Sequence, residues 1–109
     1  MIHPLLSYWA SCPLAERRNL PAESAVYAVV APDDVVDYVG ASGNLRRRFN
    51  QQRHHRAEQF DPESVIYFAR TDVESVGLFE LEYIERLQPR LDRWPVLALR
   101  STILRRSNG

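Results

Sequence analysis

Two short apolar segments joined by a turn constrain the fold of this chain more than any other feature. The first, residues 25–31, runs Ala-Val-Tyr-Ala-Val-Val-Ala, and the second spans residues 35–39. Between them lies Pro32-Asp33-Asp34, a combination that is typical of turns. Valine and tyrosine favour extended structure. The pattern therefore predicts a β-hairpin.

A helix is predicted directly after the hairpin. Ser42 and Asn44 can each serve as its N-cap. In the following segment, Leu45, Arg48 and Phe49 fall on one face at helical spacing. A charged side chain between two apolar residues on a helix face that packs against the core is unusual, because charges that only increase solubility lie on the exposed face. Arg48 is therefore a candidate functional residue.

A third strand and a second, longer helix are expected further along the chain. Residues 64–69 are again rich in residues that favour strands. Thr71 and Glu74 match a capping box. We expect the helix that they open to run to about Gln88, because Pro89 cannot continue it.

One acidic side chain interrupts the apolar stripe of this second helix. The stripe consists of Val73, Val76, Gly77, Glu80, Ile84 and Leu87. A carboxylate on an apolar face needs a cation, a hydrogen bond or a metal as its partner. Glu80 is therefore a second candidate functional residue.

This order of elements predicts one α+β domain with a small, mostly antiparallel three-stranded sheet flanked by helices. The pattern is β-β-α-β-α, with a C-terminal helix over residues 96–106. We expect an irregular N-terminal arm over residues 1–24, with a helical turn near 14–19. A core module then spans 25–92, and a helical tail spans 93–109.

Composition predicts a cytoplasmic protein that does not contact membranes. No apolar run approaches the roughly 20 residues that cross a bilayer, and the N-terminus lacks the pattern of a secretory signal. Cys12 is the only cysteine, which excludes an intrachain disulfide and a multi-cysteine zinc site.

The charges are segregated although they sum to zero. All 14 basic residues are arginines. Five of them, with two histidines and no acid, lie within residues 44–57, whereas residues 58–85 hold eight acids and one arginine. Codon bias can explain the absence of lysine, but it does not explain this segregation. Arginine suits bidentate contact with phosphate.

An ordered set of motifs resembles the GIY-YIG nuclease superfamily. Ala25-Val26-Tyr27 corresponds to its first motif, and Tyr38-Val39-Gly40, which begins eleven positions after Tyr27, corresponds to its second. Arg48 follows the glycine by eight residues, and Glu80 precedes a proline by nine. The resemblance covers nearly two-thirds of the chain and implies a GIY-YIG-like fold.

The resemblance implies a metal-dependent endonuclease that hydrolyses DNA phosphodiester bonds with structure selectivity or weak sequence specificity. Glu80 would hold a single Mg²⁺ or Mn²⁺ ion, and Arg48 would stabilise the transition state. Tyr27 would be the general base, which requires nearby positive charge to lower its pKa. Tyr38 would orient water or phosphate.

The resemblance departs from the family pattern at three positions. Ala25 replaces a glycine, Gln52 stands where His or Tyr is common, and Asp92 stands where Asn is frequent. His54 or His55 would then supply the proton shuttle or leaving-group acid. The residues expected to contact nucleic acid are Arg46, Arg47, Arg53, Arg56, Gly40 and Ser42.

Two other functions are compatible with the same residues. One is a catalytically weakened module that binds DNA or RNA. The other is a protein-interaction domain that docks through the acidic segment 58–85. For the nuclease, branched DNA or RNA is an alternative substrate. Because little chain is left for target recognition, we expect either structure-selective or weakly specific cleavage, or targeting by a homodimer or a partner protein.

Overall fold

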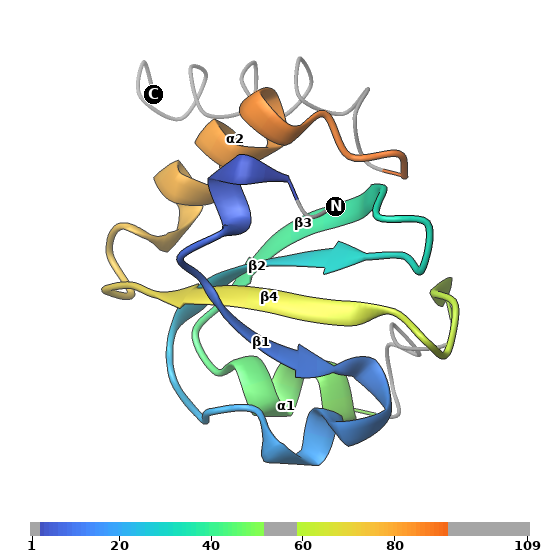
Figure 1. The fold of residues 1–109 in the computed structure, drawn as a ribbon. Coiled ribbons are helices and arrows are strands. Elements are labelled where there is room, and N and C mark those ends of the chain that lie inside the picture. Colours follow the sequence, from blue (N-terminus) through green and yellow to red (C-terminus); the bar gives the residue numbers. More distant parts are fainter. Residues whose placement is uncertain (1–2, 52–58, 92–109) are drawn as a thin grey trace.

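In the computed structural model, which describes residues 3–51 and 59–91, an antiparallel four-stranded sheet lies between helices (Figure 1). Two of the helical segments among the described residues are of the 3-10 type (η). In chain order the elements are η1 (Pro4–Leu6), β1 (Ala10–Pro13), η2 (Leu14–Asn19), β2 (Ala25–Val30), β3 (Val36–Ser42), α1 (Leu45–Asn50), β4 (Val65–Arg70) and α2 (Val76–Leu87). The predicted α+β class is confirmed.

The predicted hairpin forms the centre and one edge of the sheet. The strand order is β1-β4-β2-β3, and β2 pairs with both β3 and β4. At the turn, Asp34 adopts a left-handed conformation with φ of 66°, and its N–H donates to the carbonyl of Ala31 (2.9 Å). All six residues of β2 are buried. Both faces of the sheet must therefore be covered.

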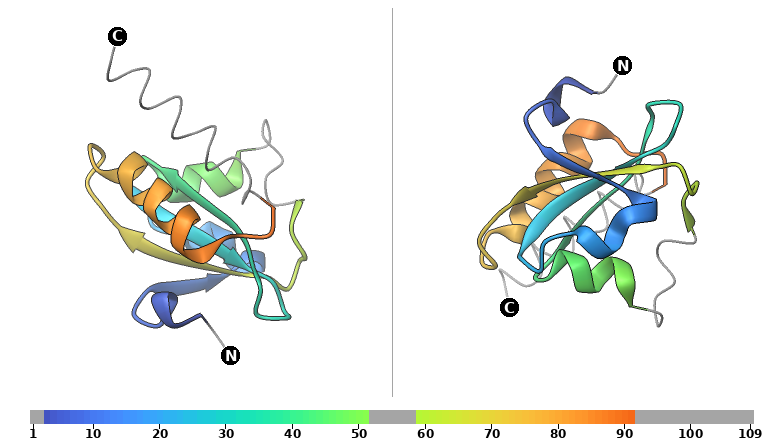
Figure 2. Two further views of the ribbon diagram at one scale, coloured as in Figure 1. Left: turned by 90° about the horizontal axis from the view of Figure 1, so that it is seen from above. Right: turned by 60° about the horizontal axis from the view of Figure 1, so that its bottom comes forward.

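Alternate residues of β2 supply two separate cores. Tyr27 and Val29 pack with Leu45 and Phe49 of α1 on one side, which we call the α1 face. Val26, Ala28 and Val30 pack with Ile84 and Leu87 of α2 on the other, which we call the α2 face. Figure 2 shows the two helices on opposite sides of the sheet.

The N-terminal segment is part of the sheet, so the prediction of an irregular arm beside three strands was wrong. β1 pairs with β4 from Ala10 opposite Phe68 to Pro13 opposite Val65. The helical turn predicted near residues 14–19 is confirmed as η2. A four-residue strand that ends in proline carries little local signal, and proline is tolerated because β1 is an edge strand.

The second helix begins four residues later than the capping box predicts. Its N-cap is Ser75, whose side chain makes no capping bond. The N–H of Thr71 instead donates to the carbonyl of Ser24 (3.0 Å). Val73 is 69% exposed and lies outside the helix. The helix ends at Leu87, close to the predicted position.

The segment after α2 is bound to the edge of β3. The N–H groups of Arg90 and Leu91 donate to the carbonyls of Val36 and Asp37 at 2.8 and 2.7 Å. The Arg90 guanidinium contacts Asp37 through Nε (2.6 Å) and Asp33 through Nη1 (3.2 Å). These contacts join the hairpin turn to the end of α2. Within the described residues, no helix is long and apolar enough to cross a membrane.

The Leu20→Ala variant tests whether the N-terminal segment belongs to the folded core. Leu20 is completely buried on the α1 face, so its truncation should lower the free energy of unfolding by about 2–5 kcal/mol. Urea denaturation followed by circular dichroism measures the change. Val73→Ala, at an exposed position, is the control. Equal effects of the two variants would mean that the segment is only loosely attached.

The Asp33→Asn variant tests the ion pair at the hairpin turn. The hydrogen bond from Arg90 lowers the pKa of the Asp33 carboxyl below its ordinary value of 3.8. The pair therefore stabilises the fold above that pH, and this stabilisation is lost as the pH falls through the lowered pKa. Unfolding measured across pH should show a neutral-pH deficit in the variant that disappears in acid. A deficit that persists in acid would contradict this origin.

Candidate functional site

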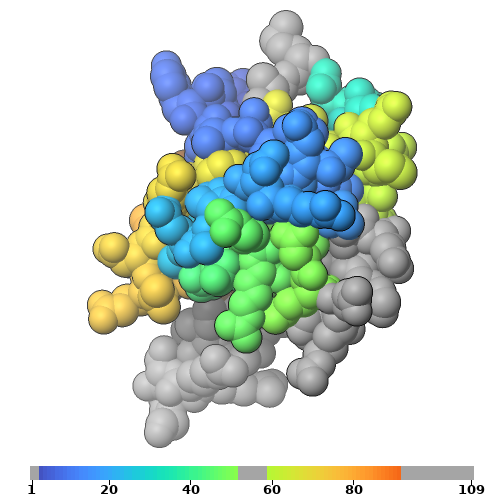
Figure 3. Space-filling model, turned by 90° about the horizontal axis from the view of Figure 1, so that it is seen from below, coloured from blue at the N-terminus to red at the C-terminus, as the bar shows by residue number. Residues whose placement is uncertain are grey.

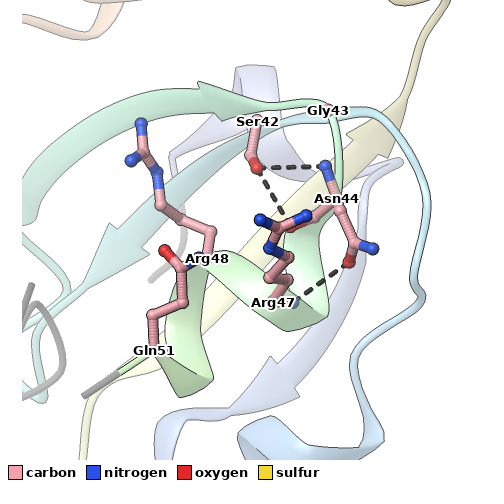
Figure 4. A pocket seen from close by; sticks show the side chains of 6 residues that line it. All are labelled: Ser42, Gly43, Asn44, Arg47, Arg48 and Gln51. Atoms are coloured by element: carbon pink, nitrogen blue, oxygen red, sulfur yellow. Dashed lines mark hydrogen bonds between the residues drawn. The ribbon is translucent and has the colours of Figure 1, made fainter. Parts of the chain in front are cut away.

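The loop between β3 and α1, together with the exposed side of α1, forms an open polar pocket of about 460 Å³. Figure 4 shows its lining residues, and Figure 3 shows α1 on the molecular surface beside η2. The pocket is lined by Ser42, Gly43, Asn44, Arg47, Arg48 and Gln51. Two arginines and a set of neutral polar groups therefore face this space.

The start of α1 is organised by Asn44 and Ser42. The Asn44 side chain accepts a hydrogen bond from the N–H of Arg47 (3.0 Å), which confirms the predicted N-cap. The Ser42 hydroxyl accepts from the N–H of Asn44 (3.1 Å) and donates to its carbonyl (2.9 Å). Ser42 lines the pocket, but its hydroxyl also holds the turn that begins the helix.

The backbone N–H groups of the first turn of α1 all have acceptors within the protein. A helix N-terminus often binds anions through such groups when they are open. Here the donors and acceptors are Leu45 N and Glu23 O (3.0 Å), Arg46 N and Pro21 O (3.0 Å), Arg47 N and Asn44 Oδ1 (3.0 Å), and Arg48 N and Asn44 O (3.0 Å). An anion in this pocket would therefore be held by side chains.

The three consecutive arginines of α1 have different surroundings. Arg48 is half-buried, and its Nε is shielded from solvent without a hydrogen-bond partner among the described residues. Arg47 is exposed at the pocket. Arg46 does not line the pocket, because its Nε donates to the carbonyl of Leu20 (2.7 Å). A buried donor without an acceptor is costly, which distinguishes Arg48 from Arg46 and Arg47.

Tyr27 and Gly40 form a close steric pair beneath this helix. They lie opposite each other in β2 and β3. A Cβ on residue 40 would overlap the Tyr27 hydroxyl and stand 2.5 Å from its Cζ and 2.8 Å from Cε1 of Tyr38. The two tyrosine rings are stacked with centroids 6.1 Å apart, and Tyr27 meets Phe49 edge-on at 4.9 Å. Gly40 therefore makes room for aromatic packing, a role different from the predicted contact with nucleic acid.

The predicted general base lies within the core. Tyr27 has no solvent exposure, and Tyr38 is half-buried. Neither ring lines the arginine pocket. The geometry gives Tyr27 a packing role that supports the β3–α1 connection. Direct contact between Tyr27 and a solvent-borne substrate would require the surrounding side chains to move.

Alanine at position 25 fits the strand without strain. Among the described residues, positive φ occurs only at Asp34 and Gln88, so Ala25 has the ordinary backbone of a strand. Its side chain is completely buried on the α1 face. The glycine expected from the resemblance is therefore not needed here for its conformational freedom.

Glu80 lies in a different layer from the other predicted catalytic residues. It is a half-buried residue in the first half of α2, whereas Arg48 and Tyr38 belong to the α1 face. Both helices begin at the same end of the sheet, where Ala25 pairs with Ser42 and with Arg70 (Figure 1). The predicted residues therefore border one end of the sheet from opposite sides of it.

The described residues contain no group of three or more His, Cys, Asp or Glu side chains that could hold a metal ion together. Several predicted positions lie outside the described residues, namely Gln52, Arg53, His54, His55, Arg56 and Asp92.

The pocket contains residues that sequence reasoning did not assign to function. Asn44 was identified only as a helix cap, and Gly43 and Gln51 gave no signal, since a loop glycine and a surface glutamine are common. No protein-family model, curated protein or solved structure matches this chain. The GIY-YIG resemblance therefore stays a prediction that rests on motif spacing.

The Gly40→Ala variant tests the steric pair. The added methyl group must displace the Tyr27 ring, and such overpacking should lower the free energy of unfolding by about 1–3 kcal/mol. Gly43→Ala is the matched control, because a Cβ there meets nothing within 4 Å. Thermal or urea unfolding provides the measurement. Equal stabilities of the two variants would contradict the close packing of Tyr27 on residue 40.

Proposed function

We propose that this protein is a metal-dependent endonuclease that hydrolyses phosphodiester bonds in DNA, with Arg48 as the residue that binds the reacting phosphate. The observation that carries this proposal is the shielded, unpartnered Nε of Arg48 beside an open polar pocket. The charge segregation and the motif spacing give further support. A cytoplasmic location and targeting by a homodimer or a partner protein are parts of the same proposal.

Arg48 is suited to phosphate because its surroundings limit its motion. Leu45 and Phe49, its neighbours on the same helix face, are both buried and fix the helix against the sheet. A guanidinium binds two phosphate oxygens in a planar, bidentate manner. Partial burial strengthens this interaction, because water competes less well. The exposed Arg47 would contact an adjacent phosphate.

Charge that develops on the phosphate during attack would be stabilised by this pre-positioned guanidinium. Tyr38 would orient the phosphate or the attacking water through its hydroxyl, and Tyr27 would keep β2 and β3 in position below it. Glu80 would hold the Mg²⁺ or Mn²⁺ ion. When bound, such an ion supplies a water of lowered pKa and neutralises negative charge.

A module that binds DNA or RNA without cutting it is the second candidate. It is favoured by the position of Glu80 on the α2 face, across the sheet from Arg48, and by the burial of Tyr27. Such a module needs only the arginine pocket. Its affinity would fall steeply with salt, because binding releases counterions from the nucleic acid.

Nicking of supercoiled and branched DNA in Mg²⁺ or Mn²⁺ tests the nuclease. We expect Arg48→Ala to reduce the nicking rate about 10²–10³-fold, since it removes a donor to the developing charge. Glu80→Gln should abolish nicking at ordinary metal concentrations, because it removes the carboxylate that would hold the ion. Two variants are the controls. Arg18→Ala changes an exposed arginine of η2, and Glu82→Gln changes an acidic residue two positions after Glu80 that forms an ion pair with Arg86 (2.8 Å).

The outcomes separate the candidate functions. Nicking that survives both Arg48→Ala and Glu80→Gln would reject the proposed site. Salt-sensitive binding that depends on Arg48, without nicking by the unmodified protein, would favour the binding module. The effects are assigned to the site only if both control variants bind and nick DNA like the unmodified protein.

A further inference from the structure

The arginine pocket, formed by side chains of α1 and the loop before it, has room for more than one phosphate group. Its volume of about 460 Å³ lies within the roughly 300–1,000 Å³ of pockets that hold whole small molecules. A phosphate group alone is far smaller than such a molecule. The pocket can therefore hold a phosphate together with the chemical groups that are joined to it.

The two arginines of this pocket occupy different parts of it. Arg47 and Arg48 are consecutive residues of α1, and consecutive side chains leave a helix in directions about 100° apart. In Figure 4 the Arg47 guanidinium lies beside the loop that contains Ser42, whereas the Arg48 guanidinium points away from that loop. The two cations do not converge on one point, so the pocket offers two separate positions for negative charge.

Arg48 and Arg47 also differ in their exposure to solvent. Nε of Arg48 is shielded from solvent, so a ligand meets this side chain through its terminal nitrogens. The side chain of Arg47 is exposed. Partial burial strengthens the attraction between a guanidinium and an anion, because water competes less well. We therefore expect a phosphate to bind more tightly at Arg48 than at Arg47.

Among the described residues, no carboxylate lines the pocket to oppose a negatively charged ligand. The other lining residues are neutral, namely Ser42, Gly43, Asn44 and Gln51. The backbone carbonyl of Glu23 accepts from the N–H of Leu45 at the start of α1 (3.0 Å), but the Glu23 carboxylate is paired with Arg70. The lining therefore complements a ligand that carries negative charge at two places.

The described lining of the pocket lacks the aromatic surfaces that hold a base. Proteins hold unpaired bases mainly by stacking them on aromatic rings, and none of the described lining residues is aromatic. The rings of Tyr27 and Tyr38 stack on each other, with centroids 6.1 Å apart, and are not part of the lining. The pocket thus fits the sugar–phosphate backbone of a nucleic acid and leaves the base outside.

We propose that the arginine pocket holds one nucleotide unit of a DNA strand by the phosphates on both sides of its sugar, with the reacting phosphate at Arg48 and the next phosphate at Arg47. This inference rests on the proposed function, because it takes the phosphate at Arg48 to be the one that is cleaved. Since the base stays outside, the pocket does not read sequence. The smallest ligands with both phosphates are nucleoside 3′,5′-bisphosphates, and the pocket accepts them with any base.

Titration of the full chain with two isomeric nucleotides, followed by nuclear magnetic resonance without divalent metal, tests this assignment. Thymidine 3′,5′-bisphosphate carries a phosphate on each side of the sugar, whereas thymidine 5′-diphosphate carries both phosphates on one side. We expect the bisphosphate to bind about tenfold more tightly, because only it reaches both arginines. The largest signal shifts should fall between Ser42 and Gln51. Deoxyadenosine 3′,5′-bisphosphate should bind like the thymidine compound, since the base makes no contact.

Variants of the two arginines separate the two phosphate positions. Arg47→Ala should remove the advantage of thymidine 3′,5′-bisphosphate over thymidine 5′-monophosphate and leave the affinity for the monophosphate unchanged, because a single phosphate occupies the tighter position at Arg48. Arg48→Ala should weaken binding of both nucleotides about tenfold. Arg18→Ala, at an exposed arginine of η2 that does not line the pocket, is the control and should leave both affinities unchanged. Circular dichroism confirms that each variant is folded.

The results distinguish this inference from the proposed function. Equal affinities for the two isomers would mean that the pocket responds only to charge, and a strong preference for one base would mean that the base is held. Either result overturns the inference alone, as does an Arg47→Ala variant that keeps the full advantage of the bisphosphate. If DNA is nicked in an Arg48-dependent manner but the bisphosphate does not bind, the inference is wrong and the proposed function stands. If the protein neither nicks DNA nor binds the bisphosphate, both fail.

Discussion

The burial of β2 on both of its faces is the constraint on which the rest of the structure depends. None of its six residues faces solvent, so apolar side chains on each side need a covering layer. α1 and η2 supply this layer on one side, and α2 and η1 supply it on the other. As a result, the residues of the GIY-YIG-like motifs are divided between two layers that share only the end of the sheet.

The arginine helix is fixed by contacts with the segment that precedes β2. Arg46 donates to the carbonyl of Leu20 and Asn50 donates to the carbonyl of Arg17, so α1 is tied to η2 by side-chain bonds in addition to apolar packing. Because α1 has only six residues, its own backbone hydrogen bonds contribute little stability. The direction in which Arg48 points therefore depends on residues that lie far from it in the chain.

The parts of the fold that could be predicted are those with local signals. The hairpin, the cap at Asn44 and the strand β4 follow from strand propensity, turn residues and helical spacing. β1 could not be predicted, because its pairing with β4 depends on residues more than fifty positions away. The start of α2 was misplaced because the N–H of Thr71 bonds to Ser24, a tertiary contact that outweighs the local capping pattern.

Only part of the candidate site could be predicted from the sequence. Arg48 was identified because charged side chains are uncommon on the apolar face of a helix. The structure agrees that this side chain is partly buried, since its Nε is shielded from solvent. The steric role of Gly40 and the depth of Tyr27 in the core could not be inferred, since both depend on the packing of two strands under a helix. The spacing of residues along the sequence identifies which of them belong to a motif, but it does not reveal which side chains are exposed to solvent.

The alanine at position 25 has a consequence for which residues the first strand of the hairpin can accept. Its methyl group occupies space in the α1 core, where removal of a buried group leaves an imperfectly filled gap. Glycine at this position would also give the unfolded chain more freedom. The glycine that the motif resemblance predicts at this position would thus be unfavourable in both the folded and the unfolded state. The methyl group makes residue 25 a member of the core and limits which substitutions the strand can accept without loss of stability.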